Sequence, residues 1–148
     1  MEPLPSAGDP YPIGLADRHL RACGVRPENS ITLAGRDGLE AQLWLCRHRY
    51  SAVNHVTGQA CGAERADVVL LTDKIAARDV EDAVRRARRL LADGGWLVTW
   101  SRDTGRADDP VHDVLAAAGF ELARCVRQGD GELHLARLRP SPAQRLAA

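Results

Sequence analysis

The sequence has few aromatic residues, a single lysine and no net charge. Only six of its 148 residues are Phe, Tyr or Trp, so aliphatic side chains must supply most of the hydrophobic core. Twenty basic and twenty acidic residues cancel, which argues against a surface that binds nucleic acid or an anionic membrane. The one lysine is Lys74, and the reliance on arginine indicates a GC-rich genome. The sequence has no Walker, GxSxG or HExxH motif, so it lacks the signatures of P-loop NTPases, α/β-hydrolases and HExxH zinc proteases.

The sequence also lacks a CxxC pair, a secretory signal and any long apolar run. Its cysteines are widely spaced, which does not fit a disulfide framework; they are Cys23, Cys46, Cys61 and Cys125. The N-terminal residues MEPLPSAGDPYPIG show neither the basic nor the apolar region of a signal peptide. No segment approaches the roughly 20 apolar residues of a membrane span. We therefore expect a soluble cytoplasmic protein with reduced thiols and no membrane contact.

A zinc site is the metal hypothesis that the sequence invites. Its candidate ligands would be Cys46, His48, His55 and Cys61. Their spacing is irregular and lacks the short Cys or His pair of structural zinc sites. Cys46 is also predicted on the inner face of a helix, where a free cysteine behaves as a small hydrophobe. We therefore expect no metal site.

The segment of residues 66–100 is the most informative part of the chain. Its first apolar run, VVLL at 68–71, suits a strand buried on both faces. Apolar residues then recur at helical spacing over residues 79–91, and Gly94-Gly95 is predicted to stop this helix. The run WLVTW at 96–100 predicts a second strand, with Trp96 and Trp100 on one side. The segment predicts one right-handed β-α-β crossover.

The remaining chain also alternates helices with strands. Helices are expected at residues 13–23 and 39–47, the second with Leu39, Leu43 and Cys46 on its inner face. Strands are expected at 30–34 and 51–56, and residues 57–65 read as a loop. Asp109 is predicted to cap a helix that starts at Pro110, since both residue types favour these positions. Residues 120–126 and 132–139 are predicted to pair as a hairpin.

This order predicts an α/β fold. Helices that alternate with strands imply a three-layer, Rossmann-like, mostly parallel sheet with helices on both faces. The hairpin adds an antiparallel C-terminal edge. We expect a flexible lead-in over residues 1–12, one domain over 13–140 and a tail over 141–148.

The chain resembles the class I S-adenosylmethionine (SAM)-dependent methyltransferases. The fourth strand, following helix and fifth strand of that family resemble ADVVLL…AVRRARRLLADGGWLVTW. Its last helix and terminal hairpin resemble VHDVLAAAGFELARCV…GELHLARLRP, and its glycine-rich first loop resembles HLRACGVRPENSITLAGRDG. The resemblance covers about residues 13–140 and implies a methyltransferase fold.

The glycine-rich loop departs from the family pattern. The position of the family's acidic residue falls on Thr32, and its three glycine positions fall on Ala34, Arg36 and Gly38. Gly38 alone is kept, Gly35 lies one residue out of phase, and Arg36 puts a long side chain where the methionine part of the cofactor would lie. The loop therefore indicates a degenerate cofactor site.

Two further departures concern the rest of the cofactor pocket. Asn54 and His55 stand where the family places a carboxylate that binds both ribose hydroxyls. Neither side chain is a bidentate charged acceptor. Residues 57–66 are too few for the family's next helix, third strand and loop, so one strand-helix unit is expected to be missing. The chain therefore resembles a degenerate and shortened member of the family.

Polar residues follow the predicted strands of the 66–100 segment. Asp73 and Lys74 come after the first strand, at the end where ligands bind in open α/β sheets. They are read either as an acid–base pair or, preferably, as loop residues that pair with each other in solvent. Asp73 is the one candidate catalytic residue. Ser101, Arg102 and Asp103 follow the second strand and are read as a solvated loop.

Three functions remain open. The first is a non-catalytic interaction or regulatory subunit that binds a protein partner or forms a homodimer and has no cofactor. The second is a minimal SAM-dependent methyltransferase that acts on a small molecule or a protein. In that case Gly35, Gly38, Asn54 and His55 would hold SAM, with Asp73 near the acceptor. The third is a protein that binds another small molecule, with Arg36 meeting an anion at a helix N-terminus.

Overall fold

The computed structural model describes residues 11–36, 38–56, 65–102 and 110–140. The described strands are β1 (Ile31–Ala34), β2 (Val53–Val56), β3 (Ala66–Ile75), β4 (Leu91–Arg102), β5 (Phe120–Gln128) and β6 (Gly131–Leu138). The helices are α1 (Ile13–Ala22), α2 (Gly38–Arg47), α3 (Val80–Leu90) and α4 (Pro110–Ala117), with a 3-10 turn, η1 (Ala77–Asp79), before α3. None of these helices is long and apolar enough to cross a membrane.

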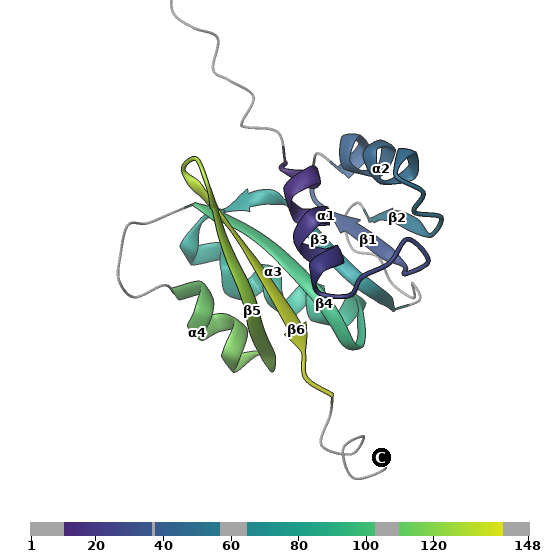
Figure 1. The fold of residues 1–148 in the computed structure, drawn as a ribbon. Helices are drawn as coiled ribbons and strands as arrows, with labels where there is room; N and C mark the ends of the chain where they lie inside the picture. Colours follow the sequence, from purple (N-terminus) through teal and green to yellow (C-terminus); the bar gives the residue numbers. More distant parts are fainter. Residues whose placement is uncertain (1–10, 37, 57–64, 103–109, 141–148) are drawn as a thin grey trace, which may run out of the picture.

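The described strands form one sheet in the order β2-β1-β3-β4-β6-β5 (Figure 1). Strands β2, β1, β3 and β4 run parallel, whereas β6 is antiparallel to both β4 and β5. The predicted crossover is confirmed as β3-α3-β4, and the predicted C-terminal hairpin is confirmed as β5-β6. The protein therefore has the expected α/β, Rossmann-like fold with a mostly parallel sheet.

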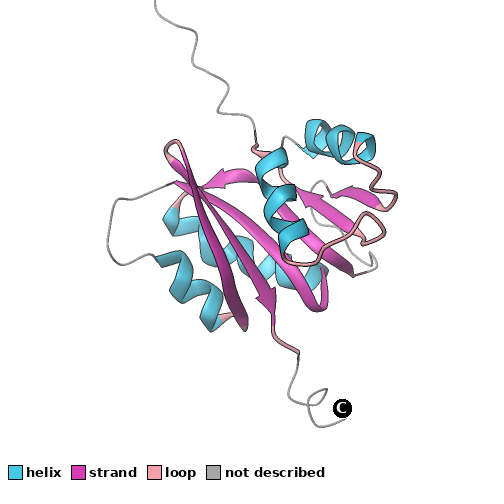
Figure 2. Ribbon diagram, viewed as in Figure 1, coloured by secondary structure: helices cyan, strands magenta, loops and turns pink. Residues whose placement is uncertain are grey.

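Helices cover both faces of the sheet (Figure 2). Helices α1 and α2 pack on one face, with Leu20 and Leu45 in a core shared with Leu33 of β1. Helices α3 and α4 pack on the other face, with Val84 and Leu115 in a second core. Each core is mainly aliphatic, as the shortage of aromatic residues predicted.

The orientation of α2 differs from the prediction. Leu39 and Leu43 are 62% and 49% exposed, and Cys46 is also exposed. The buried residues are instead Gly38, Ala41 and Leu45, which form a neighbouring stripe of the same helix at spacings of three and four residues. The prediction was wrong because two neighbouring stripes of α2 have similar periodicity, and contact with the sheet selects the stripe that starts at the small Gly38.

Strand β3 is longer than predicted. It continues to Ile75, so Thr72, Asp73 and Lys74 belong to the strand and do not form a loop after it. Its pairing with β4 shifts register between Leu70 and Lys74. Ser101 and Arg102 likewise belong to β4, whereas Asp103 lies outside the described residues.

The glycine pair does not end α3, as the sequence had suggested. The helix ends at Leu90, and Leu91 already has the extended backbone of β4, with φ −96° and ψ 139°. Leu91 is completely buried and pairs with Ala66 of β3, so tertiary packing ends the helix before the glycines. Gly94 lies inside the long β4 with φ +76°, a conformation that glycine adopts without a Cβ clash.

The structure describes the predicted N-terminal lead-in only in part and the predicted C-terminal tail not at all. Residues 1–10 of the predicted lead-in, Asp109, and the predicted tail over 141–148 lie outside the described residues. Tyr11 is 7% exposed and packs edge-on against Trp100, with ring centroids 5.6 Å apart. The end of the predicted lead-in therefore contributes to the core beside α1.

Candidate functional site

The carboxyl ends of β1, β2 and β3 surround the loop between β1 and α2. We call residues 34–36 and 38 of this connection the glycine loop. In open α/β sheets, ligands bind at this edge, in the crevice outside the carboxyl ends of the strands. The polar contacts of the glycine loop therefore decide what the site can hold.

Gly35 lies tightly against β3. Its φ is +136°, and a Cβ at this position would collide with the hydroxyl of Thr72 and lie 3.1 Å from the main-chain nitrogen of Asp73. The Thr72 hydroxyl donates a hydrogen bond to the Ala34 carbonyl, at 3.3 Å. Both the left-handed backbone and the short distance to β3 require glycine at this position.

His55 of β2 reaches the other side of the glycine loop. Its Nε2 lies 2.9 Å from the Gly35 carbonyl oxygen and can donate its proton to it in the matching tautomer. Its ring occupies the space in which a Cβ of Gly38 would lie. The imidazole therefore packs on one glycine of the loop and bonds to the other.

Asp73 also binds the glycine loop. Its Oδ1 accepts a hydrogen bond from the main-chain N–H of Arg36, at 3.1 Å. The side chain of Arg36 itself is exposed. Two main-chain polar groups of the loop, the Gly35 carbonyl and the Arg36 N–H, are thus bonded to side chains of β2 and β3.

Lys74 does not pair with Asp73, which corrects the solvent ion pair suggested by the sequence. Its Nζ lies 2.8 Å from Oδ1 of Asp130, in the β5–β6 turn, and 4.8 Å from the ring centre of Trp100. The hydrogen bond and charge of Lys74 lower the pKa of Asp130 below its usual value. Asp73 bonds to the glycine loop and Lys74 to the β5–β6 turn, so the two residues do not meet as an acid–base pair.

Asn54 does not share the position of His55. It pairs with Thr32 in the β1–β2 ladder and is exposed, while His55 pairs with Leu33 and lies on the face covered by α2. Of the residues predicted at the cofactor site, the fold thus brings together Gly35, Gly38, His55 and Asp73. Asn54 lies on the opposite face of β2.

A cavity of about 1080 Å³ adjoins the glycine loop. It is lined by Gly35 and Arg36 of the loop, Val56 of β2, Asp73 of β3 and residues of α3. Its basic lining residues are Arg36, Lys74, Arg78, Arg86, Arg89 and Arg102. Its acidic ones are Asp73, Asp79 and Asp82. The excess of positive charge suits an anionic or carboxylate-bearing ligand better than a cationic one.

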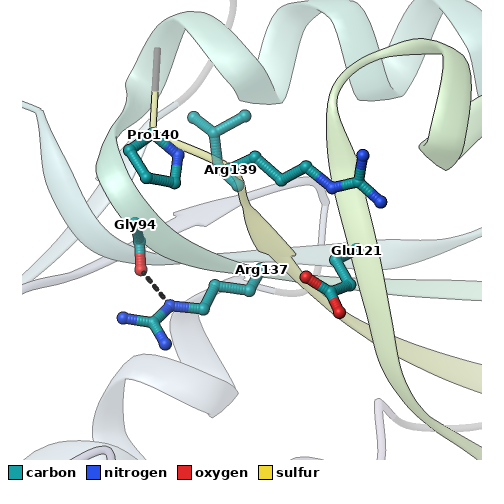
Figure 3. Close-up of a pocket in the computed structure, with 6 residues that line it drawn as sticks. Gly94, Glu121, Arg137, Arg139 and Pro140 are labelled. Atoms are coloured by element: carbon teal, nitrogen blue, oxygen red, sulfur yellow. Dashed lines mark hydrogen bonds between the residues drawn. The ribbon is translucent and has the colours of Figure 1, made fainter. Parts of the chain in front are cut away.

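A second, smaller cavity has a volume of about 500 Å³. Figure 3 shows residues that line it. Gly94, Glu121, Arg137, Arg139 and Pro140 line it. Arg137 donates a hydrogen bond from Nε to the Gly94 carbonyl, at 3.2 Å. This cavity adjoins the amino-terminal part of β4, away from the carboxyl ends of the parallel strands.

Among the described residues, the zinc candidates named from the sequence do not form a ligand cluster. Cys46 is exposed on α2, and the ring of His48 stacks on Trp44 with centroids 3.5 Å apart. His55 lies at the glycine loop, and Cys61 lies outside the described residues.

A different trio of possible ligands comes together in the described structure: His112, Cys125 and His134. Sequence reasoning missed this group because its members lie on three separate elements. The predicted hairpin was the only available signal, since it could bring Cys125 and His134 near each other.

Comparison with known proteins identifies the fold. No protein-family model and no curated protein matches the sequence. Among solved structures, the ribosomal protein L11 methylase of Lactobacillus delbrueckii subsp. bulgaricus is similar, with TM-score 0.63 and 12% identity over 86% of this chain and 78% of that one.

Two other similar structures belong to proteins with different activities. The 1,6-didemethyltoxoflavin-N1-methyltransferase of Burkholderia thailandensis, with bound S-adenosylhomocysteine, gives TM-score 0.59 and 14% identity over 86% of this chain and 76% of that one. The [4+2]-cyclase SpnF gives TM-score 0.61 and 12% identity over 87% of this chain and 81% of that one. The chain therefore has the fold of the class I SAM-dependent methyltransferases.

Proposed function

We propose that this chain is a methyltransferase-like protein with a degenerate cofactor site, and that it acts as a non-catalytic interaction subunit. The observation that carries the proposal is the internal bonding of the glycine loop. His55 bonds to the Gly35 carbonyl, and Asp73 accepts the Arg36 N–H. A ligand that needs these main-chain groups would have to break both contacts.

The identities of the surrounding residues support the same proposal. Thr32 stands where the resembled family has an acidic residue, and it is only 5% exposed. His55 and Asn54 provide no carboxylate for a ribose. Arg36 adds a positive charge at the loop, where SAM would bring a positive sulfonium. The site is thus poorly suited to SAM in both hydrogen bonding and charge.

The exposed side of α2 supports a role in protein interaction. Leu39 and Leu43 lie one turn apart and are exposed, and they are flanked by exposed Glu40 and Arg47. Glu40 and Arg47 are two turns apart, so an antiparallel α2–α2 contact would place each beside the opposite charge of the other copy. A two-fold contact of this kind is self-complementary. The proposed partner is therefore a second copy of this chain.

Calorimetric titration of SAM and S-adenosylhomocysteine into the tag-free protein tests the loss of the cofactor site. We expect no heat of binding at millimolar ligand. An active SAM-dependent methyltransferase measured under the same conditions provides the positive control. Binding with a dissociation constant in the micromolar range would overturn the proposal.

Light scattering coupled to size-exclusion chromatography tests the proposed dimer. The wild-type chain is expected to elute with a dimer mass at micromolar concentration, and the Leu39→Glu/Leu43→Glu variant as a monomer. The Ala116→Glu variant, which adds an acidic residue on α4, is the matched control and should remain a dimer. A monomeric wild-type chain would rule out self-association through α2.

A second function, a minimal SAM-dependent methyltransferase acting on a small molecule or a protein, is favoured by one observation. The cavity of about 1080 Å³ meets Gly35, Arg36 and Asp73 and is as large as ordinary cofactor sites. Transfer of a radiolabelled methyl group from SAM to lysate components, lost in the Asp73→Ala variant, would favour it. The similarity to a [4+2]-cyclase fits the general rule that one fold hosts several chemistries.

A further inference from the structure

Three metal-ligating side chains meet on the α4 side of the β5–β6 hairpin. His112 belongs to α4, Cys125 to β5 and His134 to β6, and their ligand atoms all lie within 4.8 Å of one another. We propose that these residues, together with Glu132 of β6, form a binding site for zinc. The proposal is independent of the glycine loop and of any methyltransferase activity.

A β-bulge brings Cys125 to this site. Leu122 pairs with Ala136 and Arg124 pairs with Leu135, so Ala123 is an extra residue in β5. Leu122 packs in the core below α3 and α4, and regular alternation would turn Cys125 to the opposite face. The bulge reverses the alternation, which places Cys125 directly opposite the buried His134. Bulges are frequent next to functional sites because they redirect a side chain in this way.

Packing of α4 brings in the third ligand. Val111 and Leu115 of α4 are buried in the same core as Phe120 of β5. This anchoring holds the first turn of α4 over the hairpin, and the ring of His112 lies edge-on to that of His134, with centroids 5.3 Å apart. The backbones that carry the three ligands are therefore held by hydrophobic contacts, so a bound ion would not need to assemble them.

The distances are close to those of a zinc site. With bonds of about 2.0–2.1 Å to nitrogen and 2.3 Å to sulfur, tetrahedral ligands lie roughly 3.3–3.8 Å apart. The three ligand atoms therefore have to move closer together when the ion binds, and two of the three side chains, His112 and Cys125, are exposed. Imidazole and thiolate ligands together favour zinc over calcium or magnesium, which prefer oxygen.

Glu132 supplies the fourth ligand and balances the charge. Its Oε1 accepts a hydrogen bond from the Cys125 thiol at 3.3 Å, and its Oε2 lies 3.7 Å from Nε2 of His134. Thiolate and carboxylate together carry two negative charges, which match the charge of Zn²⁺. Binding releases the thiol proton of Cys125. Because the ligands join α4 to the hairpin, the ion would clamp these elements together.

Cobalt substitution tests the site directly. Tag-free, chelator-treated protein is titrated with Co²⁺, which reports a thiolate ligand by a near-ultraviolet charge-transfer band and tetrahedral geometry by strong visible bands. Wild-type protein is expected to show both bands at one equivalent, and added Zn²⁺ is expected to abolish them. Cys125→Ser should lose the charge-transfer band, and His112→Gln should weaken Co²⁺ binding at least tenfold. Glu132→Gln removes a charged ligand and should weaken it at least as much as the loss of an outer-shell partner does, by about tenfold or more.

The control is Cys46→Ser, which removes an exposed cysteine on α2 and should leave the spectrum unchanged. The substituted residues His112, Cys125 and Cys46 are exposed, whereas Glu132 is half-buried, and circular dichroism verifies that each variant folds. Zinc should also raise the melting temperature of the wild-type chain but not of Cys125→Ser. Absence of the charge-transfer band in the wild type, or its survival in Cys125→Ser, would overturn the proposal.

Discussion

The imidazole of His55 occupies the space beside Gly38 that any larger residue would need. The Gly38→Ala variant must therefore displace this ring and strain its hydrogen bond to the Gly35 carbonyl. We expect the free energy of unfolding to fall by about 1–3 kcal/mol, as for other overpacked sites. Urea denaturation monitored by tryptophan fluorescence measures it.

The control for this prediction is Gly14→Ala on α1, where the added Cβ makes an ordinary contact of 3.6 Å with Trp44. Its stability should stay unchanged or rise by up to about 1 kcal/mol, because alanine favours the helix. The double variant Gly38→Ala/His55→Ala should cost less than the sum of its two single variants. Strict additivity would show that the two residues do not interact.

The two faces of α2 should respond oppositely to truncation. Leu45 is 1% exposed, and Leu45→Ala is expected to destabilise the chain by about 2–5 kcal/mol through loss of core contacts. Leu43 is exposed on the single chain, so Leu43→Ala should change the stability by no more than about 0.5 kcal/mol when measured at protein concentrations below those at which the proposed α2–α2 dimer forms. Thermal and chemical denaturation of the two variants compare them directly; equal losses would contradict the observed orientation of α2.

Gly131 is constrained by the indole of Trp100. A Cβ on Gly131 would lie 2.6 Å from Nε1 of Trp100, and Trp100 is 4% exposed and held by Tyr11. The Gly131→Ala variant is therefore expected to lose about 1–3 kcal/mol of stability. Asparagine at Gly129, where no atom lies within 4 Å, controls for the loss of a glycine in this turn, because asparagine tolerates the left-handed φ of +60° better than alanine does. Similar losses in both variants would argue against the Trp100 contact as the cause.

Tyr50 makes the stability of the folded chain depend on pH in the alkaline range. Its hydroxyl donates to the carboxylate of Asp17, which also pairs with Arg21, and burial followed by this hydrogen bond raises the pKa of Tyr50 to about 12. The folded state thus holds the proton more tightly than the unfolded chain, whose tyrosine pKa is about 10. This contribution is complete below pH 10 and is lost as the pH rises to about 12.

The Tyr50→Phe variant should therefore lose about 1.5–3 kcal/mol at neutral pH, since a hydrogen bond to a charged group is removed. Its stability should then decline less steeply than that of the wild type between pH 10 and 12. Urea midpoints across this range measure both effects. The other tyrosine, Tyr11, is present in both proteins, so its own titration cancels in the comparison. Parallel pH curves would contradict the assignment.

Local patterns in the sequence were sufficient to predict the main elements of the fold. The run at 68–71 and the run at 96–100 became neighbouring parallel strands, and the helical pattern between them became α3. The terminal apolar segments became the β5–β6 hairpin. These predictions succeeded because strand and helix periodicity depend on which side chains must leave water, and that is written along the chain.

Features that depend on contacts between distant segments could not be predicted from local patterns. The stripe of α2 that faces the sheet, the end of α3 at Leu90 and the extension of β3 through Asp73 all follow from packing against other elements. At the glycine loop, the sequence identified Gly35, Gly38, His55 and Asp73, but their mutual hydrogen bonds required the assembled sheet.

The sequence by itself thus determined the α/β order, the crossover and the region of the glycine loop, because these depend on local composition and periodicity. Only the tertiary structure decided which groups meet. His55 closes on the loop because β2 pairs with β1, and Cys125 faces His134 because one extra residue in β5 reverses the alternation of side chains. Such encounters depend on strand register, which a one-residue shift inverts and which no local pattern specifies.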